Sequence, residues 1–568
     1  GRVHHAADAD AARKIVSEIC SAAGARLVVK GKSMTGEEVR LNEALIAAGF
    51  TVFETDLGEY IIQLAGQGPS HIVLPAIHMS KAEIAALFHD KLGMPLTDDA
   101  EALTQKAREV LRVKFLAADV GITGANALIA ENGMVALVEN EGNIRLSTTL
   151  PRVHIALVGI EKILPRLDDL AVLLKLLPRN ATGQKMSGYV SFIRGGRQAP
   201  ERDGASEFHL VLLDNGRSKL MADPVMRDAL KCIRCGACLN HCPVYQHIGG
   251  HAYGSTYPGP IGAMITRALG AGDAEGWFLP FASTLCGACT AACPARIPIH
   301  KILIELRRRA TEAGLADAAE GLAFGAWSQL WSRTVGYRVT SVAMRVGGRL
   351  LAKDGAIKKL PAPFDGWTKV RDLPAPAAKP FRAGWADAPA VGKRVPLANP
   401  PSLLEDEPAP LVEKPLRVDS PRPGDAARFV AELSARKATV IETEGIEGAK
   451  RELLRALSDF SGHKMVRWDH PELDALGVDE LAASVRVLVK QAAGEELKPA
   501  AADAAVGVTA VDGASAATGT MALFTGGGTE RSISLLPPAH VALLRREKIF
   551  EDTEDLIALA RNRGEAFR

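Results

Sequence analysis

Seven of the eight cysteines fall in two short runs whose spacing suits iron–sulfur chemistry. The first run contains Cys232, Cys235, Cys238 and Cys242, followed by Pro243, and matches the bacterial ferredoxin pattern C-x2-C-x2-C-x3-C-P. The second contains Cys286, Cys289 and Cys293, followed by Pro294, with Ser283 where the pattern places its first cysteine. Soft thiolates suit iron–sulfur clusters and zinc. The spacing predicts two iron–sulfur clusters, whose commonest chemistry is electron transfer.

The ferredoxin pattern also predicts which cysteines share a cluster. Three cysteines two residues apart wrap around one cubane, whereas the cysteine before the proline ligates the other cluster. A first [4Fe-4S] cluster is therefore assigned to Cys232, Cys235, Cys238 and Cys293. The second cluster is assigned to Cys242, Cys286 and Cys289, with Ser283 beside its fourth iron. Zinc fits less well because zinc sites usually show paired C-x2-C units, and so long a chain does not resemble a disulfide scaffold.

Ser283 leaves the nature of the second cluster open. The serine could ligate iron as an alkoxide, the site could hold a [3Fe-4S] cluster, or a [4Fe-4S] cluster could keep one iron open. An open iron could act as a Lewis acid and chelate a 2-hydroxy acid through its hydroxyl and carboxylate. Ser283 could also cap a turn and take no part in binding iron.

Length and composition favour a multidomain globular protein. At 568 residues the chain exceeds the size of a single core, and 47% of its residues are apolar. The net charge of +2 gives no overall bias toward nucleic acid. The sequence contains no run of about 18 apolar residues that would predict a membrane span. Thiolate-held clusters and the lone Cys20 predict a cytoplasmic protein, which could associate with the inner face of the membrane through a complex.

An internal repeat organises the chain. Residues 120–170 align without a gap on residues 506–556, at an offset of 386, with 19 identities in 51 positions. Three pairs of the repeated residues carry chemistry: Arg145 with Arg531, His154 with His540, and Lys162 with Lys548. The chain is therefore predicted to carry two copies of one domain, one on each side of the cysteine region.

The local patterns predict alternating strands and helices. Strands are expected at 25–29, 51–54, 71–74, 133–138, 153–158 and 438–442. Helices are expected at 35–48, opened by a capping box of Thr35 and Glu38, and at 81–92, 163–177 and 446–457. Alternating strands and helices indicate an α/β fold with a largely parallel sheet, covered on both faces.

Four segments follow from these patterns. They are a first α/β domain (1–220), a helical domain with two iron–sulfur clusters (221–353), a proline-rich linker (354–424) and a second α/β domain (425–568). Fourteen of the 32 prolines lie at 361–423, and Trp367 and Trp385 within this stretch suggest partial packing on a surface. Residues 319–351 carry an apolar stripe with Phe324 and Trp327. This stripe suits a core, a partner-docking face or, given its Arg and Lys flanks, a membrane surface.

The chain resembles the bacterial lactate-utilisation iron–sulfur proteins. Residues 1–400 resemble lactate utilisation protein B through 30–38 (KGKSMTGEE), 54–64 (ETDLGEYIIQL), the first cysteine run and 285–298. Residues 425–568 resemble lactate utilisation protein C through 507–509 (GVT), 518–520 (TGT) and 534–541 (SLLPPAHV). The resemblance implies that the two proteins are fused here and that each copy folds like the sugar-phosphate isomerase and CoA-transferase group.

The resemblance also implies a function. In that family a complex oxidises L-lactate to pyruvate without a nicotinamide cofactor, and Ser283 is a family trait. The chain is then expected to be an electron-transfer subunit that needs a separate cysteine-rich subunit and a membrane or soluble electron acceptor, with no nucleic-acid partner. Because the family's B protein begins earlier, residues are expected before Gly1. Two alternatives stay open: a subunit of a different oxidase or dehydrogenase, and a scaffold with structural clusters.

Further candidate residues have two interpretations each. The repeated Arg, His and Lys pairs could bind a carboxylate or phosphate, or could reflect only the shared fold. Lys30 and Lys32 follow a strand end, where they could hold an anion or lie in a solvated loop. His241 and Arg296 stand beside cluster cysteines and could tune a reduction potential. The sequence identifies no catalytic base.

Overall fold

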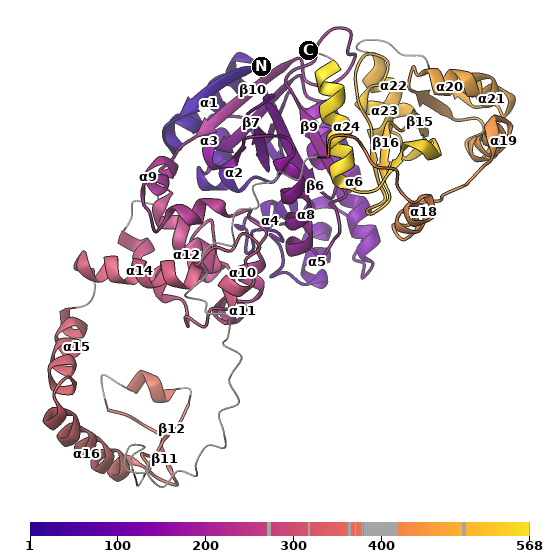
Figure 1. Ribbon diagram of the computed structural model, residues 1–568. Helices are drawn as coiled ribbons and strands as arrows, with labels where there is room; N and C mark the ends of the chain where they lie inside the picture. Colours follow the sequence, from indigo (N-terminus) through magenta and orange to yellow (C-terminus); the bar gives the residue numbers. More distant parts are fainter. Residues whose placement is uncertain are drawn as a thin grey trace. The chain divides into compact units, whose positions relative to one another are not determined.

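Figure 1 shows the computed structural model of the chain, which describes residues 1–269, 274–315, 318–361, 365–369, 371–377, 379, 418–490 and 496–566. These residues form two compact units. The first unit contains Gly1–Arg307 and Lys414–Arg568, and the second contains Arg308–Glu413. Both copies of the repeat and the cysteine region therefore belong to one unit.

A six-stranded, all-parallel sheet forms the centre of the first copy. Its strand order is β1 (Arg2–Ala6), β10 (Glu207–Leu213), β7 (Val153–Gly159), β4 (Val120–Thr123), β2 (Leu27–Lys30) and β3 (Thr51–Glu54). The surrounding helices are α1 (Ala9–Ala22), α2 (Met34–Glu38), α3 (Leu41–Ala47), α4 (Leu57–Ala65), α5 (Lys81–Leu92) and α6 (Ala100–Ala117). The central strands are fully buried because helices cover both faces, as near-continuous apolar runs require. The predicted parallel α/β fold is confirmed.

A smaller mixed sheet lies beside the main sheet. It contains β8 (Ile163–Leu164), β5 (Ala127–Ile129), β6 (Met134–Glu139) and β9 (Tyr189–Ile193). Two helices belong to it, α7 (Asn143–Thr149) and α8 (Asp169–Ala181). The carboxylate of Glu139, at the end of β6, accepts hydrogen bonds from the first N–H groups of α7, at Ile144 and Arg145.

The second copy repeats this architecture, which confirms the internal repeat. Its parallel sheet has the order β14 (Leu488–Val489), β13 (Lys464–Arg467), β15 (Val506–Ala510) and β18 (Ala539–Leu543), and its small sheet contains β17 (Thr520–Ala522), β16 (Gly513–Ser515) and β19 (Ile549–Phe550). Its helices are α18 (Ala426–Ser434), α19 (Gly445–Ser458), α20 (Pro471–Leu476), α21 (Val478–Ser484), α22 (Leu497–Asp503), α23 (Arg531–Leu535) and α24 (Thr553–Ala566). Strands β16 and β19 lie 386 residues after β5 and β8, as the alignment requires.

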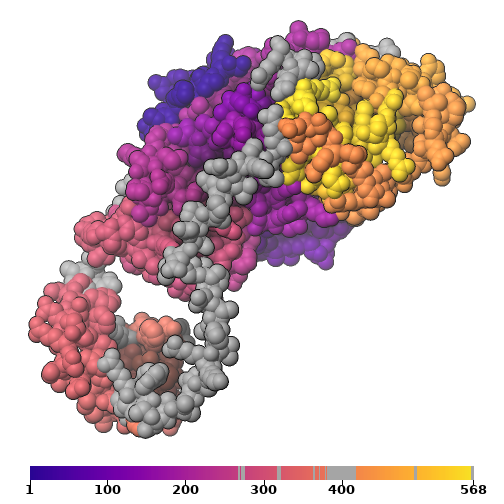
Figure 2. All heavy atoms as spheres, viewed as in Figure 1, coloured from indigo at the N-terminus to yellow at the C-terminus, as the bar shows by residue number. Residues whose placement is uncertain are grey.

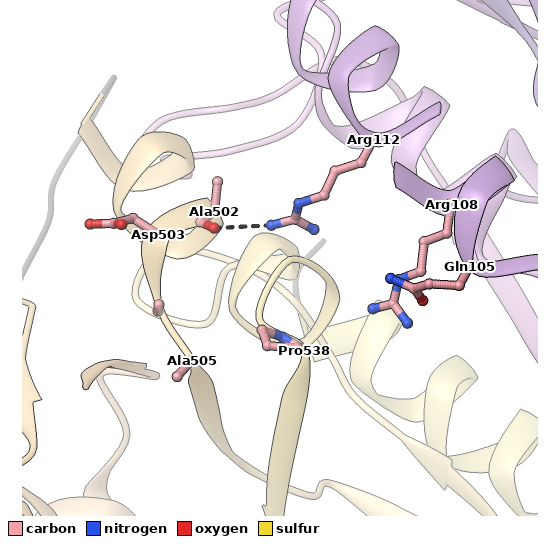
Figure 3. Close-up of a pocket in the computed structure, with 8 residues that line it drawn as sticks. Gln105, Arg108, Arg112, Ala502, Asp503, Ala505 and Pro538 are labelled. Carbon is pink, nitrogen blue, oxygen red and sulfur yellow. Dashed lines mark hydrogen bonds between the residues drawn. The ribbon is translucent and has the colours of Figure 1, made fainter. Parts of the chain in front are cut away.

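The two copies pack against each other through equivalent residues. Arg112 of α6 donates to the carbonyl oxygen of Ala502 (Figure 3) and to that of Leu536. Lys498 of α22 donates to the carbonyl oxygen of Leu150. Arg112 and Lys498 are 386 residues apart, and so are Leu150 and Leu536. The contacts are therefore related by a pseudo-twofold arrangement, and Figure 2 shows the second copy, orange to yellow, against the purple residues of the first.

A pair of repeated glycines permits the close packing within each copy. A Cβ atom on Gly121 of β4 would lie 1.8 Å from the carbonyl oxygen of Ser147, in α7. A Cβ atom on Gly507 of β15 would lie 1.9 Å from the carbonyl oxygen of Ile533, in α23. The recurrence of these glycines thus has a steric cause, since any side chain would push the short helix away from the sheet.

The cysteine region is helical and has a core of its own. Its helices are α9 (Arg217–Ala222), α10 (Ala237–Asn240), α11 (Pro243–Ile248), α12 (Gly259–Ala268), α13 (Ala288–Ala291) and α14 (Ile299–Glu312). Leu239, Met264, Ile265 and Leu303 are buried together in its centre. Each cysteine run is a loop followed by a very short helix, α10 in the first run and α13 in the second.

In the described residues of the second unit, two α-helices are followed by a short antiparallel ribbon. These are α15 (Ala318–Trp331), α16 (Thr334–Leu351), and the antiparallel strands β11 (Ala356–Ile357) and β12 (Leu373–Pro374). Among the described residues, every helix is too short or too polar to cross a bilayer. Much of the predicted linker, including Trp385, lies outside the described residues.

Four predictions of local structure are wrong. The expected helix at 35–48 is two helices, because Arg40 has a φ of 51° between them, and Ser33 rather than Thr35 caps the first. The segment 71–74 is not a strand, because the ring nitrogen of His71 accepts the N–H groups of Val73 and Leu74. Residues 438–442 form no strand, and the helix expected at 163–177 is preceded by β8 and begins at Asp169.

Candidate iron–sulfur site

The two cysteine runs share one loop geometry. In the first run Arg234 and Gly236 have φ angles of 63° and 74°, and in the second run Leu285 and Gly287, at the same pattern positions, have 56° and 81°. These left-handed turns curl the backbone so that its N–H groups point toward the side chain that begins each run. The sequence pattern and the backbone conformation therefore agree.

Ser283 takes the structural place of a cysteine. The backbone N–H of Arg234 donates to the sulfur of Cys232 at 3.4 Å, and the N–H of Leu285 donates to the hydroxyl of Ser283 at 3.1 Å. Each acceptor stands two residues before its donor. Ser283 thus caps a turn and also presents its oxygen where the first run presents a thiol, so the two interpretations of this serine are compatible.

The structure brings Cys293 to the cysteines of the first run. One cavity is lined by Cys232, Cys235, Cys238 and Cys293, together with Arg234 and Ile261. Burial raises the pKa of Cys235 to about 11, and the charges of Cys232 and Cys293 add to the effect. Four soft donors that converge on one cavity are the set that an iron–sulfur cluster takes. The residues of this cavity therefore fit a cluster.

The remaining three cysteines form a second, more exposed group. Burial raises the pKa of Cys289, and the neighbouring Cys242 and Cys286 raise it further. Cys286 is exposed, and the backbone N–H of Ala288 and the hydroxyl of Thr284 lower its pKa. In the first group Cys235 and Cys238 are buried and the other two cysteines are half-buried, whereas in the second group Cys286 is exposed at the surface.

Two positively charged side chains lie beside Cys232 of the first group. The ammonium of Lys162 donates to the carbonyl oxygen of Cys232 at 3.4 Å, and the guanidinium of Arg234 donates to the same oxygen at 3.3 Å. Burial lowers the pKa of Lys162 to about 8, with a further contribution from Arg234. Burial opposes the charge of Arg234, but Cys232, Tyr257 and Glu161 lie beside it and raise its pKa. Both cations are aimed at the segment that carries the first thiol.

An ion network connects these cations to the first α/β domain. Arg217 is fully buried and donates to both carboxylate oxygens of Glu38 at 2.9 Å and to Glu161 at 2.5 Å. Glu161 also pairs with Arg234 at 3.5 Å, and the hydroxyl of Tyr257 donates to Glu38 at 2.8 Å. Such a fully paired buried network fixes the position of the cysteine region on the domain.

The recurrent residues of the repeat have different roles. His154 pairs with the hydroxyl of Thr123 at 2.9 Å, and His540 pairs with Thr509 at 2.9 Å, so the histidines reflect the shared fold. Burial lowers the pKa of His154 to about 3 and of His540 to about 4, and an arginine of the opposite copy adds to each shift.

The recurrent residues Arg145, Lys162 and Lys548 make contacts that differ from those of the recurrent histidines. Arg145 donates to the hydroxyl of Ser534 at 3.2 Å and so joins the two copies. Lys548 donates to the carbonyl oxygen of Val511 at 3.0 Å and pairs with Glu472 at 2.9 Å, whereas its repeat partner Lys162 faces Cys232. In the sequence, the recurrence of Lys162 was the one indication of this position, and nothing indicated Arg234 or Arg217.

Lys30 and Lys32 do not form a solvated loop. Lys30 is fully buried, and its ammonium pairs with Glu54 at 2.7 Å and with Glu37 at 3.0 Å. Lys32 donates to the carbonyl oxygen of Val73 at 2.5 Å. Burial raises the pKa of the adjacent Glu59 to about 8, with a further contribution from Glu54. Carboxylates already neutralise Lys30, which therefore stabilises the strand ends rather than offering charge to an anion.

His241 and Arg296 each make a hydrogen bond with a backbone carbonyl oxygen of a cysteine loop. The ring of His241 pairs with the carbonyl oxygen of Ala237 at 2.9 Å, and the backbone N–H of Arg296 donates to the carbonyl oxygen of Cys293 at 3.1 Å. Arg296 has a φ of 52°. These two residues therefore support the turns around Cys238 and Cys293 in the described structure.

Comparisons with known proteins agree with these features. Residues 1–213 and 426–567 match the family model of the LUD domain, and residues 228–297 match that of the 4Fe-4S dicluster domain. "Lactate utilization protein B" of Shouchella clausii is 47% identical over 67% of this chain and 80% of its own length. The protein of that name from Bacillus subtilis is 43% identical over 68% of this chain and 81% of its own length. A DUF162 family protein from Deinococcus radiodurans, solved by crystallography, is 12% identical at a TM-score of 0.20, with 38% of this chain and 88% of that chain covered.

Proposed function

This chain belongs to the LUD-domain family and carries a 4Fe-4S dicluster domain, and from that premise we propose that it is the iron–sulfur electron-transfer subunit of a complex that oxidises L-lactate to pyruvate without a nicotinamide cofactor. Two observations together support this proposal. The chain has two groups of cysteines, and its relatives at about 45% identity are named lactate utilization protein B. The proposal keeps the four segments predicted from the sequence, with domain boundaries after residues 220, 353 and 424.

The proposal assigns each cysteine group a cluster. Cys232, Cys235, Cys238 and Cys293 would hold one, and Cys242, Cys286 and Cys289 the other, with Ser283 at the remaining position. When bound, such clusters accept and release single electrons. Oxidation of L-lactate to pyruvate releases two electrons and two protons, so two one-electron carriers in one chain match the two electrons.

The residues around the first group have three tasks in this proposal. Buried apolar side chains such as Leu239 exclude water from Cys238. The backbone N–H of Arg234 donates to Cys232, which disperses negative charge on the sulfur. Lys162 and Arg234 supply positive charge, which favours addition of an electron nearby.

The residues around the second group suit exchange with a partner. Cys286 is exposed, and Phe278 and Phe281, which precede it in the chain by five to eight residues, are about half exposed. Electron transfer between two proteins requires their redox centres to lie close together. A site at the protein surface shortens the distance to a redox centre in a docked subunit. We therefore place the second group at the contact with the separate cysteine-rich subunit, or with the electron acceptor.

The test is an anaerobic reduction of the chain together with the subunits encoded beside it. L-lactate is added, and the visible absorbance and the EPR spectrum are followed, with D-lactate as the matched control. The proposal expects bleaching and new reduced-cluster signals with L-lactate only. A chain that dithionite reduces but neither isomer reduces would be an electron carrier for another donor, and a chain that holds zinc or cannot be reduced would be a scaffold.

A further inference from the structure

The helix pair α15 and α16 exposes many large apolar side chains. Every residue from Gly321 to Leu330 of α15 is exposed, including Leu322, Phe324 and Trp327. In α16 no described residue is buried. Exposed apolar surface of this extent marks a binding site, because leaving it in water is costly.

The apolar surface of α16 is arranged as a stripe. Its members are Val335, Val339, Val342, Val346 and Leu350, and half or more of each side chain is exposed. Their spacing of 4, 3, 4 and 4 residues places them on one face of the helix. The polar groups of α16 lie outside this face, so the helix is amphipathic, and within the second unit no described residue covers its apolar side.

Basic residues border this stripe. Arg338, Arg345 and Arg349 are spaced by 7 and 4 residues and form a second line about 80° around the helix from the apolar one. Residues 321–353 contain five basic residues and no acidic residue. A stretch of this length with the average composition of the chain would carry about four acidic residues. The helix pair is thus positively charged although the chain as a whole is nearly neutral.

Aromatic rings line the bend between the two helices. Phe324, Trp327, Trp331 and Tyr337 contact one another in sequence, with ring centroids 5.3 to 6.4 Å apart. Figure 1 shows α16 continuing from the end of α15 at an angle. Tryptophan and tyrosine favour the boundary between lipid and water, because the ring is apolar and its edge carries a donor.

We propose that α15 and α16 form a membrane-surface anchor that lies flat on an anionic lipid bilayer. The valine stripe and the aromatic rings enter the boundary between headgroups and acyl chains, and the arginine line contacts the anionic headgroups. Charge complementarity selects this occupant over a second copy of the chain, whose same surface is equally basic. The inference is independent of the proposed function, since it concerns where the chain works and not what it oxidises.

The test is flotation of the full chain with lipid vesicles. Vesicles of seven parts phosphatidylcholine and three parts phosphatidylglycerol are compared with vesicles of phosphatidylcholine alone. We expect the chain to float with the anionic vesicles and, at raised salt, to float less. The triple variant Arg338→Gln, Arg345→Gln and Arg349→Gln should lower the partition coefficient roughly a hundredfold.

Two control variants distinguish membrane binding by this helix pair from effects of net charge and of exposed apolar residues in general. The variant Arg40→Gln, Arg451→Gln and Arg455→Gln removes three exposed arginines elsewhere and should leave flotation unchanged. Val339→Gln with Val346→Gln should abolish flotation, whereas the similarly exposed Val113→Gln should not. Circular dichroism verifies that the variants remain folded.

Four results would overturn the proposal. Equal flotation with neutral and anionic vesicles would remove the role of the arginines, and equal loss in both arginine triples would reduce the effect to net charge. The wild-type chain could instead bind neither kind of vesicle and form a dimer that the variant Val339→Gln with Val346→Gln dissociates. This result would assign the surface to a second copy of the chain. Tight binding of a purified acidic subunit, lost in the same variant, would assign it to that protein.

Discussion

Replacing Lys162 should change the reduction potential of one cluster and leave the other unchanged. Lys162→Met removes the ammonium that lies 3.4 Å from the carbonyl oxygen of Cys232, and methionine keeps most of the side-chain volume. The lysine is half-buried, and its pKa of about 8 leaves it mostly charged at pH 7. Loss of this positive charge makes addition of an electron less favourable, so the potential should fall.

The magnitude follows from Coulomb's law. A unit charge about 8 Å from the added electron contributes ~2 kcal/mol at the effective dielectric constant of about 20 that buried sites show. For a one-electron couple this is ~90 mV, since a tenfold change in the equilibrium constant corresponds to about 59 mV. Arg234 remains in place in the variant, so the cluster should still assemble.

The assay is a potentiometric titration followed by EPR on the anaerobically purified chain. The matched control is Lys548→Met, which replaces the repeat-equivalent lysine that donates to the carbonyl oxygen of Val511. We expect one signal to move by ~90 mV to lower potential in Lys162→Met, and neither signal to move in the control. A shift below about 20 mV, or the same shift in both variants, would refute the electrostatic role of Lys162.

Three further variants test the fold, each by urea unfolding. Arg217→Met should destabilise the chain by ~3–5 kcal/mol, because two buried carboxylates lose their cation, and a loss below about 1 kcal/mol would contradict the network. Gly121→Ala should cost ~1–3 kcal/mol, since its Cβ overlaps a helix carbonyl, whereas Gly68→Ala has free space and should cost less than about 0.5 kcal/mol. As pH falls from 6.5 toward 3, the free energy of unfolding of the wild type should fall by ~1.4 kcal/mol per pH unit relative to that of His154→Asn. The reason is that in this pH range His154 accepts a proton only in the unfolded chain. Parallel pH profiles of the two proteins would contradict a buried neutral ring.

Spacing along the sequence predicted that Cys293 lies with the first cysteine run, and the assignment of these cysteines to one cluster stays a prediction. The rule that the cysteine before proline crosses to the other cluster places Cys293 with Cys232, and the structure has both at one cavity. Periodicity likewise predicted β3 and α5 to the residue, because each is a local pattern with clear ends. Such features depend on neighbours within a few residues.

Features that depend on tertiary contacts could not be read from local patterns. The segment 71–74 has the composition of a strand, but the side chain of His71 takes its backbone N–H groups and no neighbouring strand is available to it in the described structure. The role of Lys162 depends on a loop 70 residues away. The crossed contacts of the two copies, such as Arg112 with Leu536, depend on how two domains pack and leave no periodic trace.

The most direct measurement compares the reduced EPR spectra of three cysteine variants, each with its iron and sulfide content. We expect Cys293→Ala and Cys235→Ala to lose the same cluster signal and Cys289→Ala to lose the other. Cys20→Ala is the control, because this buried thiol lies outside both groups, and it should retain both signals. If Cys293→Ala instead lost the signal that Cys289→Ala loses, the crossed assignment of the two clusters would be contradicted.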